Sequence, residues 1–480
     1  MSTRPTILWF RNDLRLSDHP ALIAASRRGQ VLPVFILDDE AAGRWRAGGA
    51  RRWWLHGSLH ALAERIAEGG GQLLLKRGDT LDILSDLARE SGADAVHFTR
   101  AYEPWARQLE ERVHQRFGES MEVRRYPGAL LSEPDRVSTR TGDPYRVFTP
   151  FWKALQEQVG QPVPEAAPEP DWVSAGPGDD LASWDLLPTR PDWAGGLREN
   201  WIPGESGAAR RLARFVEAAA LDYQTHRDRP DLAGTSRLSP YLQHGEVSPR
   251  QVWHRLSLAV TEGALPGPAA NAYLRELGWR EFSYHLLFHF PDLPLANFRP
   301  QFDHFPWRSN EAHLDAWQRG QTGYPLVDAG MRELWHTGWM HNRVRMIVGS
   351  FLVKHLLIDW RRGEEWFWDT LVDADLASNS ASWQWVAGSG ADAAPYFRIF
   401  NPIIQGEKFD PDGAYVRRWV PEIAGLPNRF LNKPWEAPAA VLREAGIQLG
   451  DSYPSPLVVH AEARQEALAA YNVIKGAARG

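Results

Sequence analysis

The 480-residue chain contains no cysteine and only five methionines. Without thiols it forms neither disulfides nor a thiolate nucleophile or metal site, which fits a reducing cytosol. No apolar run is long enough to span a bilayer, and the start, MSTRPTILWFRNDLRL, carries only a short apolar stretch before Arg11. We therefore expect neither a signal peptide nor a membrane anchor, and a cytoplasmic location.

Familiar catalytic motifs are missing too. The G-x-G-x-x-G fingerprint does not follow the first strand-like run, so we expect no standard nicotinamide dinucleotide site there. Neither a G-x-S-x-G nor a Walker A motif occurs. His56 with His60, and His285 with His289, have helical spacing but lack a third ligand and the H-E-x-x-H sequence. We therefore expect no metal site, and ordinary hydrogen-bonded histidines instead.

Tryptophan, in contrast, is abundant, with 23 residues in the chain. Indoles fill large helical cores, and they are also oxidisable aromatic groups, so both roles stay open. Hydrophobic residues make up 43% of the sequence and charged residues 24%, the profile of a globular protein. The net charge is −6, so any binding of nucleic acid must use a local basic patch.

Two kinds of pattern divide the chain. Strand-like runs such as TILWF, VLPVFILD and DAVHFTR alternate with helical patterns in the first part, which predicts a Rossmann-like parallel α/β sheet. The Pro- and Gly-rich stretch QPVPEAAPEPDWVSAGPGDD indicates a linker. From Trp201 onward the pattern is mostly helical. We therefore predict an α/β domain at 1–130, an interdomain linker at 131–200 and a large all-α catalytic domain at 201–480.

A cluster of hydroxyl side chains precedes an apolar helical run in AGTSRLSPYLQHGEVSPR. Thr235, Ser236 and Ser239 at such a place fit a phosphate cradle, although a simple helix N-cap explains this stretch better when it is taken alone. Just upstream, Tyr223 and Arg227 are four residues apart and therefore share one helical face.

A second candidate group lies in LRELGWREFSYH. Glu276, Trp279 and Arg280 have the spacing of one helical face, an unusual combination for a core stripe. A half-buried face with salt bridges accounts for these residues equally well. In WMHNRVRMIVG, Asn342 and Met346 are likewise one turn apart.

The stretch DADLASNSASWQW combines two acids, two amides and two indoles, but it offers no evident nucleophile or metal ligand. If this stretch is helical, Asn379 and Trp383 are one turn apart. Taken singly, Trp307 and Trp360 would be assigned to a hydrophobic core. The residues alone therefore leave open which chemistry this stretch carries.

Several long motifs resemble those of one family. GTSRLSPYL, WREF, TGYPLVDAGMRELWHTGWMHNRVRM, FLVKHLLIDW and DADLASNSASWQWVAGSGADAAPYFRIFNP are similar to the flavin-binding domain of the photolyase/cryptochrome family. LWFRNDLRLSDHPAL and YRVFTPFWKA resemble its other signatures, so the resemblance covers nearly the whole chain. Within the family, the sequence resembles a bacterial class I photolyase acting on cyclobutane pyrimidine dimers (CPDs) in DNA.

The resemblance implies an FAD cofactor that is reduced when active and bound in the helical domain. The residues implied around its phosphates and ribityl chain are Tyr223, Thr235, Ser236, Arg237, Leu238 and Ser239. Arg345, Asp373 and Asp375 are implied near the isoalloxazine and ribose, with Asn379 facing flavin N5. A carboxylate in place of Asn379 would favour an oxidised resting flavin, as in plant-type cryptochromes.

The resemblance also implies how light drives repair. The excited, reduced flavin gives an electron to a dimer that has left the duplex, the ring splits, and the electron returns. The residues implied at the dimer or its DNA strand are Arg227, Glu276, Trp279, Arg280, Asn342, Arg343, Met346 and Trp385. Of these, Glu276, Asn342 and Met346 are expected to act in catalysis together with Asn379. Trp383, Trp360 and Trp307 are implied, in that order, as an electron chain from the flavin to the surface.

Two other functions and one question remain open at this point. Repair of the pyrimidine–pyrimidone photoproduct uses histidine at the pocket, whereas this chain has Asn342 and Met346 there. A cryptochrome that signals in blue light and repairs nothing is the alternative from another class. An antenna chromophore in the α/β domain is not specified, because AYEPWARQLEERV does not reproduce the folate-type pattern around Glu103; methenyltetrahydrofolate, a deazaflavin, a second flavin or no antenna all fit. The expected partner is UV-damaged DNA, with no obligate protein partner, and the family suggests a monomer associated with the nucleoid.

Overall fold

The computed structural model describes residues 2–393 and 397–477. The chain folds into two compact units, each built from several segments. Unit 1 comprises residues 1–221, 236–291 and 372–375; unit 2 comprises residues 222–235, 292–371 and 376–480. Within the described residues, no helix combines the length and the hydrophobicity that crossing a bilayer requires.

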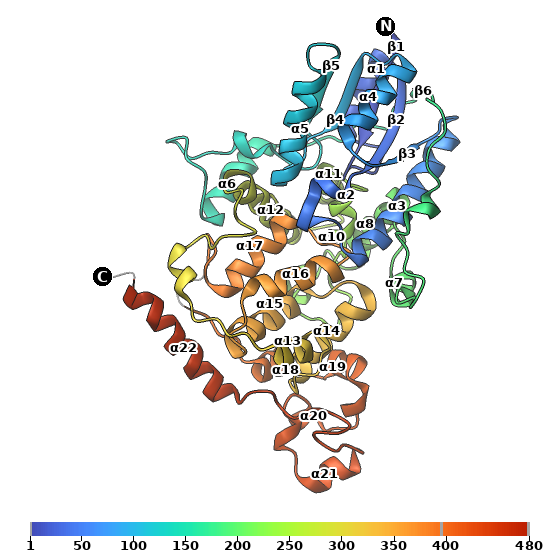
Figure 1. Ribbon diagram of the computed structural model, residues 1–480. Helices are drawn as coiled ribbons and strands as arrows, with labels where there is room; N and C mark the ends of the chain where they lie inside the picture. Colours follow the sequence, from blue (N-terminus) through green and yellow to red (C-terminus); the bar gives the residue numbers. More distant parts are fainter. Residues whose placement is uncertain (1, 394–396, 478–480) are drawn as a thin grey trace. The chain divides into compact units, whose positions relative to one another are not determined.

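A parallel sheet forms the centre of unit 1 (Figure 1). Its strands are β1 (Ser2–Phe10), β2 (Gly29–Leu37), β3 (Leu74–Arg77), β4 (Ala95–Thr99), β5 (Glu122–Tyr126) and the short β6 (Asp171–Trp172). The order is β3-β2-β1-β4-β5, and β6 pairs with β2. Every pairing is parallel, so the carboxyl ends of the strands meet at one edge.

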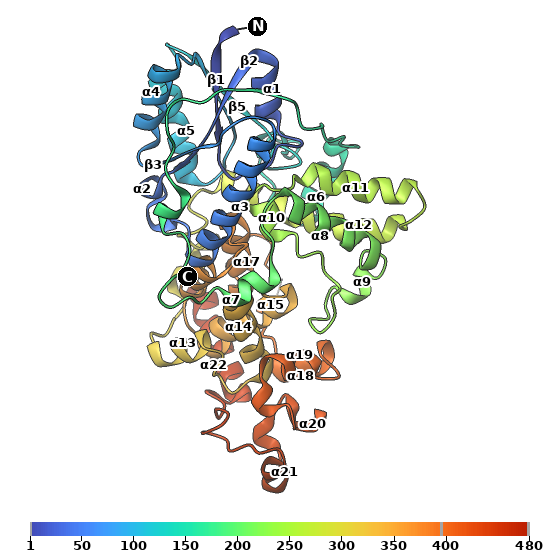
Figure 2. The same ribbon diagram turned by 90° about the vertical axis from the view of Figure 1, so that its right-hand side faces the viewer.

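Helices cover both faces of this sheet (Figure 2). Successive residues of a strand point to opposite faces, and β1 follows this rule: Leu8 and Phe10 join one core, Ile7 and Trp9 the other. The first core contains side chains of α1 (Pro20–Arg28) and α3 (Gly49–Glu68). The second contains side chains of α4 (Thr80–Ser91) and α5 (Pro104–Phe117).

Unit 1 contains further helices besides those that cover the sheet. Its other helices are α2 (Asp39–Ala42), α6 (Phe148–Val159), α7 (Gly195–Asn200), α8 (Glu205–Ala218), α10 (Ser239–Gln243), α11 (Pro249–Thr261) and α12 (Gly267–His289), with the 3₁₀ helices η1 (Gly43–Trp45), η2 (Pro134–Arg136) and η3 (Leu181–Trp184). Ser248 caps α11 with a complete capping box, because its side chain and that of Gln251 each accept the other's backbone N–H.

Unit 2 is formed by helices. They are α9 (Tyr223–His226), α13 (Glu311–Gln318), α14 (Pro325–Thr337), α15 (Asn342–Ser350), α16 (Trp360–Thr370), α17 (Leu376–Ala387), α18 (Pro402–Phe409), α19 (Ala414–Trp419), α20 (Asn428–Leu431), α21 (Ala439–Glu444) and α22 (His460–Ala477). The turns η4 (Pro300–His304), η6 (Pro421–Ile423) and η7 (Pro434–Glu436) are 3₁₀ helices, and η5 (Phe351–His355) is a π-helix that continues α15.

The predicted fold class is confirmed: a parallel α/β sheet is followed by a predominantly helical region. The strand-like runs TILWF, VLPVFILD and DAVHFTR lie in β1, β2 and β4. The Pro- and Gly-rich stretch, interpreted as a linker, contributes more than a connection. Its residues Asp171 and Trp172 pair with Gln30 and Val31, so this segment adds a short sixth strand to the sheet.

Candidate functional site

Two aspartates in the segment before α17 are buried in unit 1 and bound to side chains of other elements. Asp373 and Asp375 are each 7% exposed. The hydroxyl of Ser239, the first residue of α10, donates to Asp373 Oδ2 at 2.6 Å. The phenol of Tyr284 on α12 donates to Asp375 Oδ2 at 2.6 Å. The structure therefore brings the predicted Ser239 and Asp373 together and adds Tyr284, which the sequence did not indicate.

The hydroxyl-rich stretch before α10 does not act as a simple N-cap. The N-cap residue is Leu238, and no side chain caps the helix. Ser236 instead lies within hydrogen-bonding distance of the Tyr273 hydroxyl, at 2.8 Å, and accepts the Leu238 N–H. Arg237 has a φ of 52°, in the left-handed region. The N-cap interpretation was therefore wrong, because the hydroxyl of Ser239 donates to Asp373 instead of accepting a backbone N–H of the helix.

The other end of α10 contacts the second aspartate. In the orientation of the Gln243 amide that satisfies both of its groups, the nitrogen donates to Asp375 Oδ2 at 2.9 Å. The Gln243 oxygen then accepts from Arg51 at 3.3 Å. Helix α10 thus binds Asp373 through its first residue and Asp375 through its last.

Residues of α12 predicted to contact the dimer have different environments. Glu276 and Trp279 are half-buried, and the Trp279 ring stacks on Phe148 with centroids 3.7 Å apart and planes 8° from parallel. Arg280 donates to the backbone oxygen of Ala129 at 2.9 Å, and its guanidinium lies 4.8 Å from the centre of the Tyr284 ring. Arg280 therefore has hydrogen-bond and ring partners inside unit 1, and its contact with the dimer or its DNA strand stays a prediction.

Unit 1 also contains a cavity of about 190 Å³ at the carboxyl edge of the sheet, which we call the sheet-edge pocket. Residues just beyond three neighbouring strands line it: Arg11 and Asn12 after β1, Asp38 and Asp39 after β2, and Arg100 to Glu103 after β4. In open α/β sheets, ligands bind outside the carboxyl ends of the strands where the strand order reverses, here between β1 and β4. The pocket therefore occupies the expected ligand site of this architecture.

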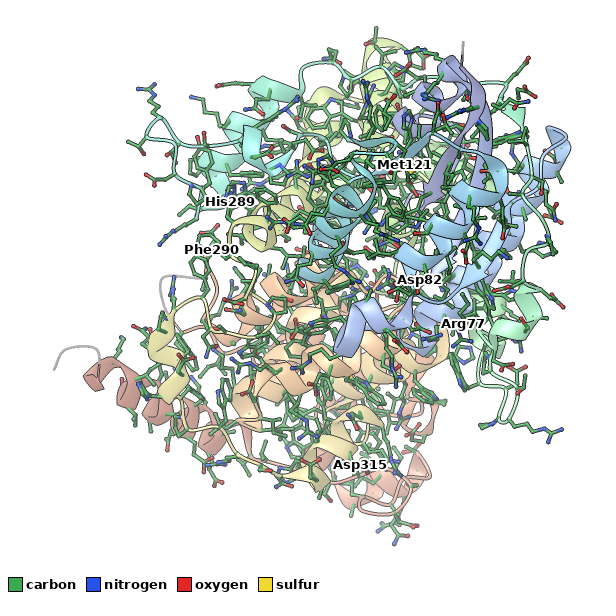
Figure 3. The ribbon with its side chains drawn as sticks, turned by 45° about the horizontal axis from the view of Figure 1, so that its top comes forward. Arg77, Asp82, Met121, His289, Phe290 and Asp315 are labelled. Atoms are coloured by element: carbon green, nitrogen blue, oxygen red, sulfur yellow. The ribbon has the colours of Figure 1, made fainter. Side chains whose placement is uncertain are left out.

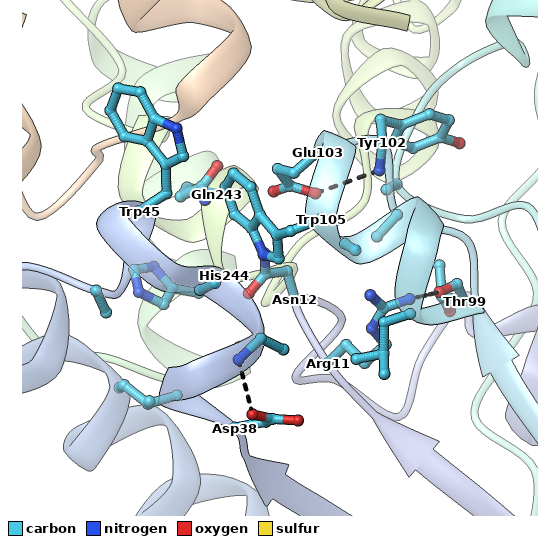
Figure 4. A pocket seen from close by; sticks show the side chains of 18 of the residues that line it. Arg11, Asn12, Asp38, Trp45, Thr99, Tyr102, Glu103, Trp105, Gln243 and His244 are labelled. Carbon is cyan, nitrogen blue, oxygen red and sulfur yellow. Dashed lines mark hydrogen bonds between the residues drawn. The ribbon is translucent and has the colours of Figure 1, made fainter. Parts of the chain in front are cut away.

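Aromatic and polar side chains surround the sheet-edge pocket (Figure 4). The figure shows the indoles of Trp45 and Trp105 together with Glu103, Gln243 and His244. Arg51, Arg280 and Tyr284 complete the polar wall. Flat rings with a few convergent polar groups suit a planar, partly polar ligand.

The sequence did not identify these pocket residues as a group. One available signal was their position directly after the predicted strands, since parallel strands deliver such residues to one edge. Arg77, which ends β3, and Asp82, in the first turn of α4, are labelled in Figure 3; neither lines the pocket. Tyr284 and Gln243 carry no such signal, because they come from helices far along the chain.

Asn379, on α17 of unit 2, has a defined amide orientation. Its nitrogen donates to the backbone oxygen of Glu364 on α16 at 3.0 Å. The next residue, Ser380, donates its hydroxyl to the Glu364 carboxylate. The bond from the nitrogen to Glu364 fixes the orientation of the amide, and its oxygen can accept a hydrogen bond from a ligand.

The three predicted electron-carrying indoles are all in unit 2. Trp383 is 3% exposed and packs on α16 at Gly363, where an added Cβ would overlap the indole ring. Trp360, the first residue of α16, is fully buried and donates to Asn297 at 3.0 Å. Trp307 is half-buried, and the centre of its ring lies 4.3 Å from the centre of the Phe305 ring. The first two indoles of the predicted order, Trp383 and Trp360, are therefore buried, and the last, Trp307, is half-buried.

Four more of the residues predicted at the cofactor or the DNA lie in unit 2. Tyr223 is buried with the Arg227 guanidinium 5.4 Å from its ring centre, which agrees with the predicted shared face. Arg343 pairs with Asp228 at 2.9 Å. Arg345 donates to the backbone oxygen of Met340 at 2.8 Å.

Four further predicted residues of unit 2 are accessible to different degrees. Asn342, at the start of α15, is exposed, whereas Thr235, Met346 and Trp385 are half-buried. Asn342 and Met346 lie one turn apart on α15, as the sequence predicts. These positions leave their side chains available to a ligand.

Comparisons with known proteins assign the chain to a family. Residues 6–170 match the model for DNA photolyase, and residues 273–473 match the model for the FAD binding domain of DNA photolyase. A deoxyribodipyrimidine photo-lyase of Agrobacterium fabrum is 51% identical over 99% of both chains. Cryptochrome-1 of Arabidopsis thaliana is 39% identical over 96% of this chain and 69% of its own length.

Two solved structures show the same architecture. The crystal structure of a bacterial class III photolyase from Agrobacterium tumefaciens has a TM-score of 0.95 and 50% identity, covering 99% of this chain and 98% of that one. An archaeal photolyase from Sulfolobus tokodaii with two FAD molecules has a TM-score of 0.81 and 29% identity, covering 98% and 99%. These findings confirm the predicted photolyase-type enzyme and its FAD, but they do not support the class I assignment. The chain belongs to the photolyase/cryptochrome family.

Proposed function

We propose that this protein repairs cyclobutane pyrimidine dimers in DNA by light-driven electron transfer from reduced FAD. The observation that carries the proposal is the amide of Asn379, whose nitrogen is bound to the backbone of Glu364 and whose oxygen can accept a hydrogen bond. An amide at this position suits a flavin that works in its reduced form, whereas a carboxylate would favour the oxidised form. The 51% identity to a photo-lyase over 99% of both chains supports the same function.

The residues present fit an FAD. In unit 1, Ser236, Arg237, Leu238 and Ser239 offer hydroxyl groups and backbone N–H groups for phosphates, and Asp373 and Asp375 offer carboxylates for ribose hydroxyls or the flavin ring. In unit 2, the indole N–H of Trp383 is buried with no hydrogen-bond partner among the described residues. Buried donors are normally paired, so an unpaired one is expected beside a ligand.

In unit 1, the residues proposed for FAD are Ser236 to Ser239 and the two aspartates. In unit 2, they are Tyr223, Thr235, Arg345 and Asn379. When bound and reduced, FAD supplies an electron donor that light can excite. The protein's own contribution is to orient the ring, to exclude water from it and to place Asn379 beside it.

The dimer is proposed to contact both polar and aromatic side chains. The carboxyl of Glu276 is proposed to hydrogen-bond its bases, Asn342 and Met346 to contact the dimer, and Trp279 and Trp385 to offer it apolar surfaces. The stack of Trp279 on Phe148 holds that indole in place before any ligand arrives. Arg227 and Arg343 would contact the DNA backbone, and Arg343 would exchange Asp228 for a phosphate.

For the subgroup, we propose class III rather than the class I assignment suggested by the sequence motifs. The support is the 50% identity and the TM-score of 0.95 with a class III photolyase. Trp383, Trp360 and Trp307 are proposed to pass electrons inward and reduce flavin that has become oxidised. The protein is proposed to act as a monomer in the cytosol, with damaged DNA as its partner.

The sheet-edge pocket is proposed to hold a second, light-harvesting chromophore. Its support is the position at the carboxyl edge of the sheet and the indoles of Trp45 and Trp105 in its wall (Figure 4). The archaeal relative with two FAD molecules shows that this family accommodates a second chromophore. Absorption and fluorescence spectra of the purified protein would identify it.

Signalling without repair is the second candidate function, because Cryptochrome-1 is 39% identical to this chain. One experiment separates the two candidates. Reduced holoprotein is illuminated with DNA that contains cyclobutane dimers, and thymine absorbance is followed. We expect light-dependent recovery of the absorbance, with a dark sample as control. Absence of recovery in light would leave signalling as the better account.

DNA binding supplies an independent check. Contacts between arginines and phosphates release counterions, so affinity for damaged DNA should fall steeply as salt rises. A filter-binding or anisotropy titration at several salt concentrations would measure the slope. Affinity that does not change with salt would contradict a basic DNA-binding surface.

A further inference from the structure

Asp375 depends on two neutral donors that also form the wall of the sheet-edge pocket. The Tyr284 phenol and the Gln243 amide both donate to its Oδ2, at 2.6 and 2.9 Å. Asp375 does not line the pocket, whereas Tyr284 and Gln243 do. Hydrogen bonds replace the hydration that a buried carboxylate loses, so these two donors help to stabilise its charge.

Tyr284 is held in position from two sides. The Arg280 guanidinium lies 4.8 Å from the centre of its ring, and the ring of Tyr102 meets it edge-on at 5.5 Å. Burial raises the pKa of Tyr284 well above its usual value, and the negative charge of Asp375 is the next largest cause. The phenol therefore keeps its proton and remains a donor at any working pH.

Gln243 connects the same carboxylate to the rest of the network. It is the last residue of α10, whose first residue, Ser239, binds Asp373. Its amide oxygen accepts from Arg51, which also lines the pocket. A change in the pocket wall at Tyr284 or Gln243 therefore reaches a carboxylate that is predicted to face the flavin.

We propose that Tyr284 is a positioning residue for the flavin reaction, which it influences by binding Asp375 from the wall of the sheet-edge pocket, with Gln243 as its weaker partner. This inference rests on the proposed function, because it requires Asp375 to lie near FAD. The hydrogen bonds spread the negative charge of Asp375 over its donors. Without these hydrogen bonds the negative charge of Asp375 would be more concentrated. It would then repel an anionic, reduced flavin more strongly and disfavour reduction of the flavin.

The test compares three variants as FAD-loaded holoproteins. Tyr284→Phe removes the donor to Asp375 and little else, and Gln243→Met removes the amide at nearly constant volume. Tyr241→Phe is the matched control: it is also a buried phenol, on α10 itself, but its hydroxyl donates to the backbone of Ile202 at 3.1 Å. The measurement is the ratio of reduced to oxidised flavin at a fixed potential, with FAD content and urea unfolding followed in parallel.

Tyr284→Phe should lower that ratio about tenfold, because it deletes a hydrogen bond to a charged group. Gln243→Met should lower it less, and Tyr241→Phe should leave it unchanged, with FAD content equal in all three. An unchanged ratio in Tyr284→Phe, or an equal change in Tyr241→Phe, would overturn the inference. If Tyr284→Phe does not fold, Gln243→Met against Tyr241→Phe decides the question. Wild-type holoprotein that binds FAD but repairs no dimer would refute the proposed function instead, and the two failures are thus distinct.

Discussion

Two regions of this protein bury chemically important side chains in opposite ways. In unit 1, the carboxylates of Asp373 and Asp375 are held by hydroxyl and amide groups at 2.6–2.9 Å. In unit 2, Trp383 is held by shape: it lies on Gly363 and meets the rings of Phe367 and Trp317 edge-on, at 5.0 and 6.3 Å. Directional bonds position the first group, and close packing positions the second.

The difference follows from what each region is proposed to do. A buried carboxylate requires hydrogen bonds in place of its lost hydration. An indole that passes an electron needs only its ring, and apolar packing fixes a ring without adding charge. The two regions should therefore respond to different substitutions, the first to loss of a donor and the second to a change of ring or volume.

The largest effect is expected from a change of ring in unit 2. Trp307→Phe removes the half-buried end of the predicted electron chain, and it should slow photoreduction of oxidised FAD to a small fraction of the wild-type rate. Repair by enzyme that has been reduced beforehand should be unaffected. Flavin absorbance during illumination measures the first quantity, and thymine absorbance measures the second.

A second indole serves as the control for this experiment. Trp193, in the segment between η3 and α7, is 36% exposed and lies outside the predicted chain. Trp193→Phe should therefore leave photoreduction unchanged. Equal loss of photoreduction and repair in Trp307→Phe would mean that the indole chain is wrongly placed.

The contrast between the regions also explains what could be predicted from the sequence. Strands β1, β2 and β4 were predictable because apolar runs in a parallel sheet have a simple pattern. The helical spacing of Asn379 and Trp383 is confirmed, since both lie on α17. Local periodicity was sufficient in these cases.

Contacts between distant segments were not predictable. Tyr284 and Asp375 are 91 positions apart, and no period or motif connects them. The stretch from Thr235 to Ser239 was interpreted as a helix N-cap because hydroxyl side chains before a helix often cap it, but the Ser239 hydroxyl binds Asp373, 134 positions away. Strand β6 was missed because two residues are too few for an alternating pattern, and only the pairing with β2 reveals it.

The pH dependence of stability should reveal the hydrogen-bonded type of burial. Glu246 of unit 1 is buried and accepts from Ser58, Trp54 and the backbone of Gly204. Burial raises the pKa of Glu246 from 4.5 to about 8. Between these values the native protein holds a proton that the unfolded chain has lost, so this contribution to stability is complete below about pH 4.5 and is lost as pH rises through 8.

Glu246→Gln should remove this dependence. Urea unfolding of the holoprotein at several pH values from 5 to 8 would give the slope for each form. The wild type should lose several kcal/mol of unfolding free energy across the window, whereas the variant, with no titrating group at this position, should show a flatter curve. A slope that is the same in both proteins would show that Glu246 is already charged at the lower pH.

The smallest expected effect tests the packed type of burial with two glycines that face the same ring. A Cβ at Gly363 on α16 would overlap the Trp383 indole, whereas a Cβ at Gly349 on α15 would meet it at an ordinary 3.4 Å. Alanine is favoured over glycine inside a helix by roughly 1 kcal/mol, so Gly349→Ala should be neutral or slightly stabilising. Gly363→Ala should instead destabilise the protein by about 1–3 kcal/mol, because overpacking displaces the ring. Urea unfolding of both variants measures the difference, and since the same ring and the same substitution are involved, equal effects would mean that packing at Gly363 does not position Trp383.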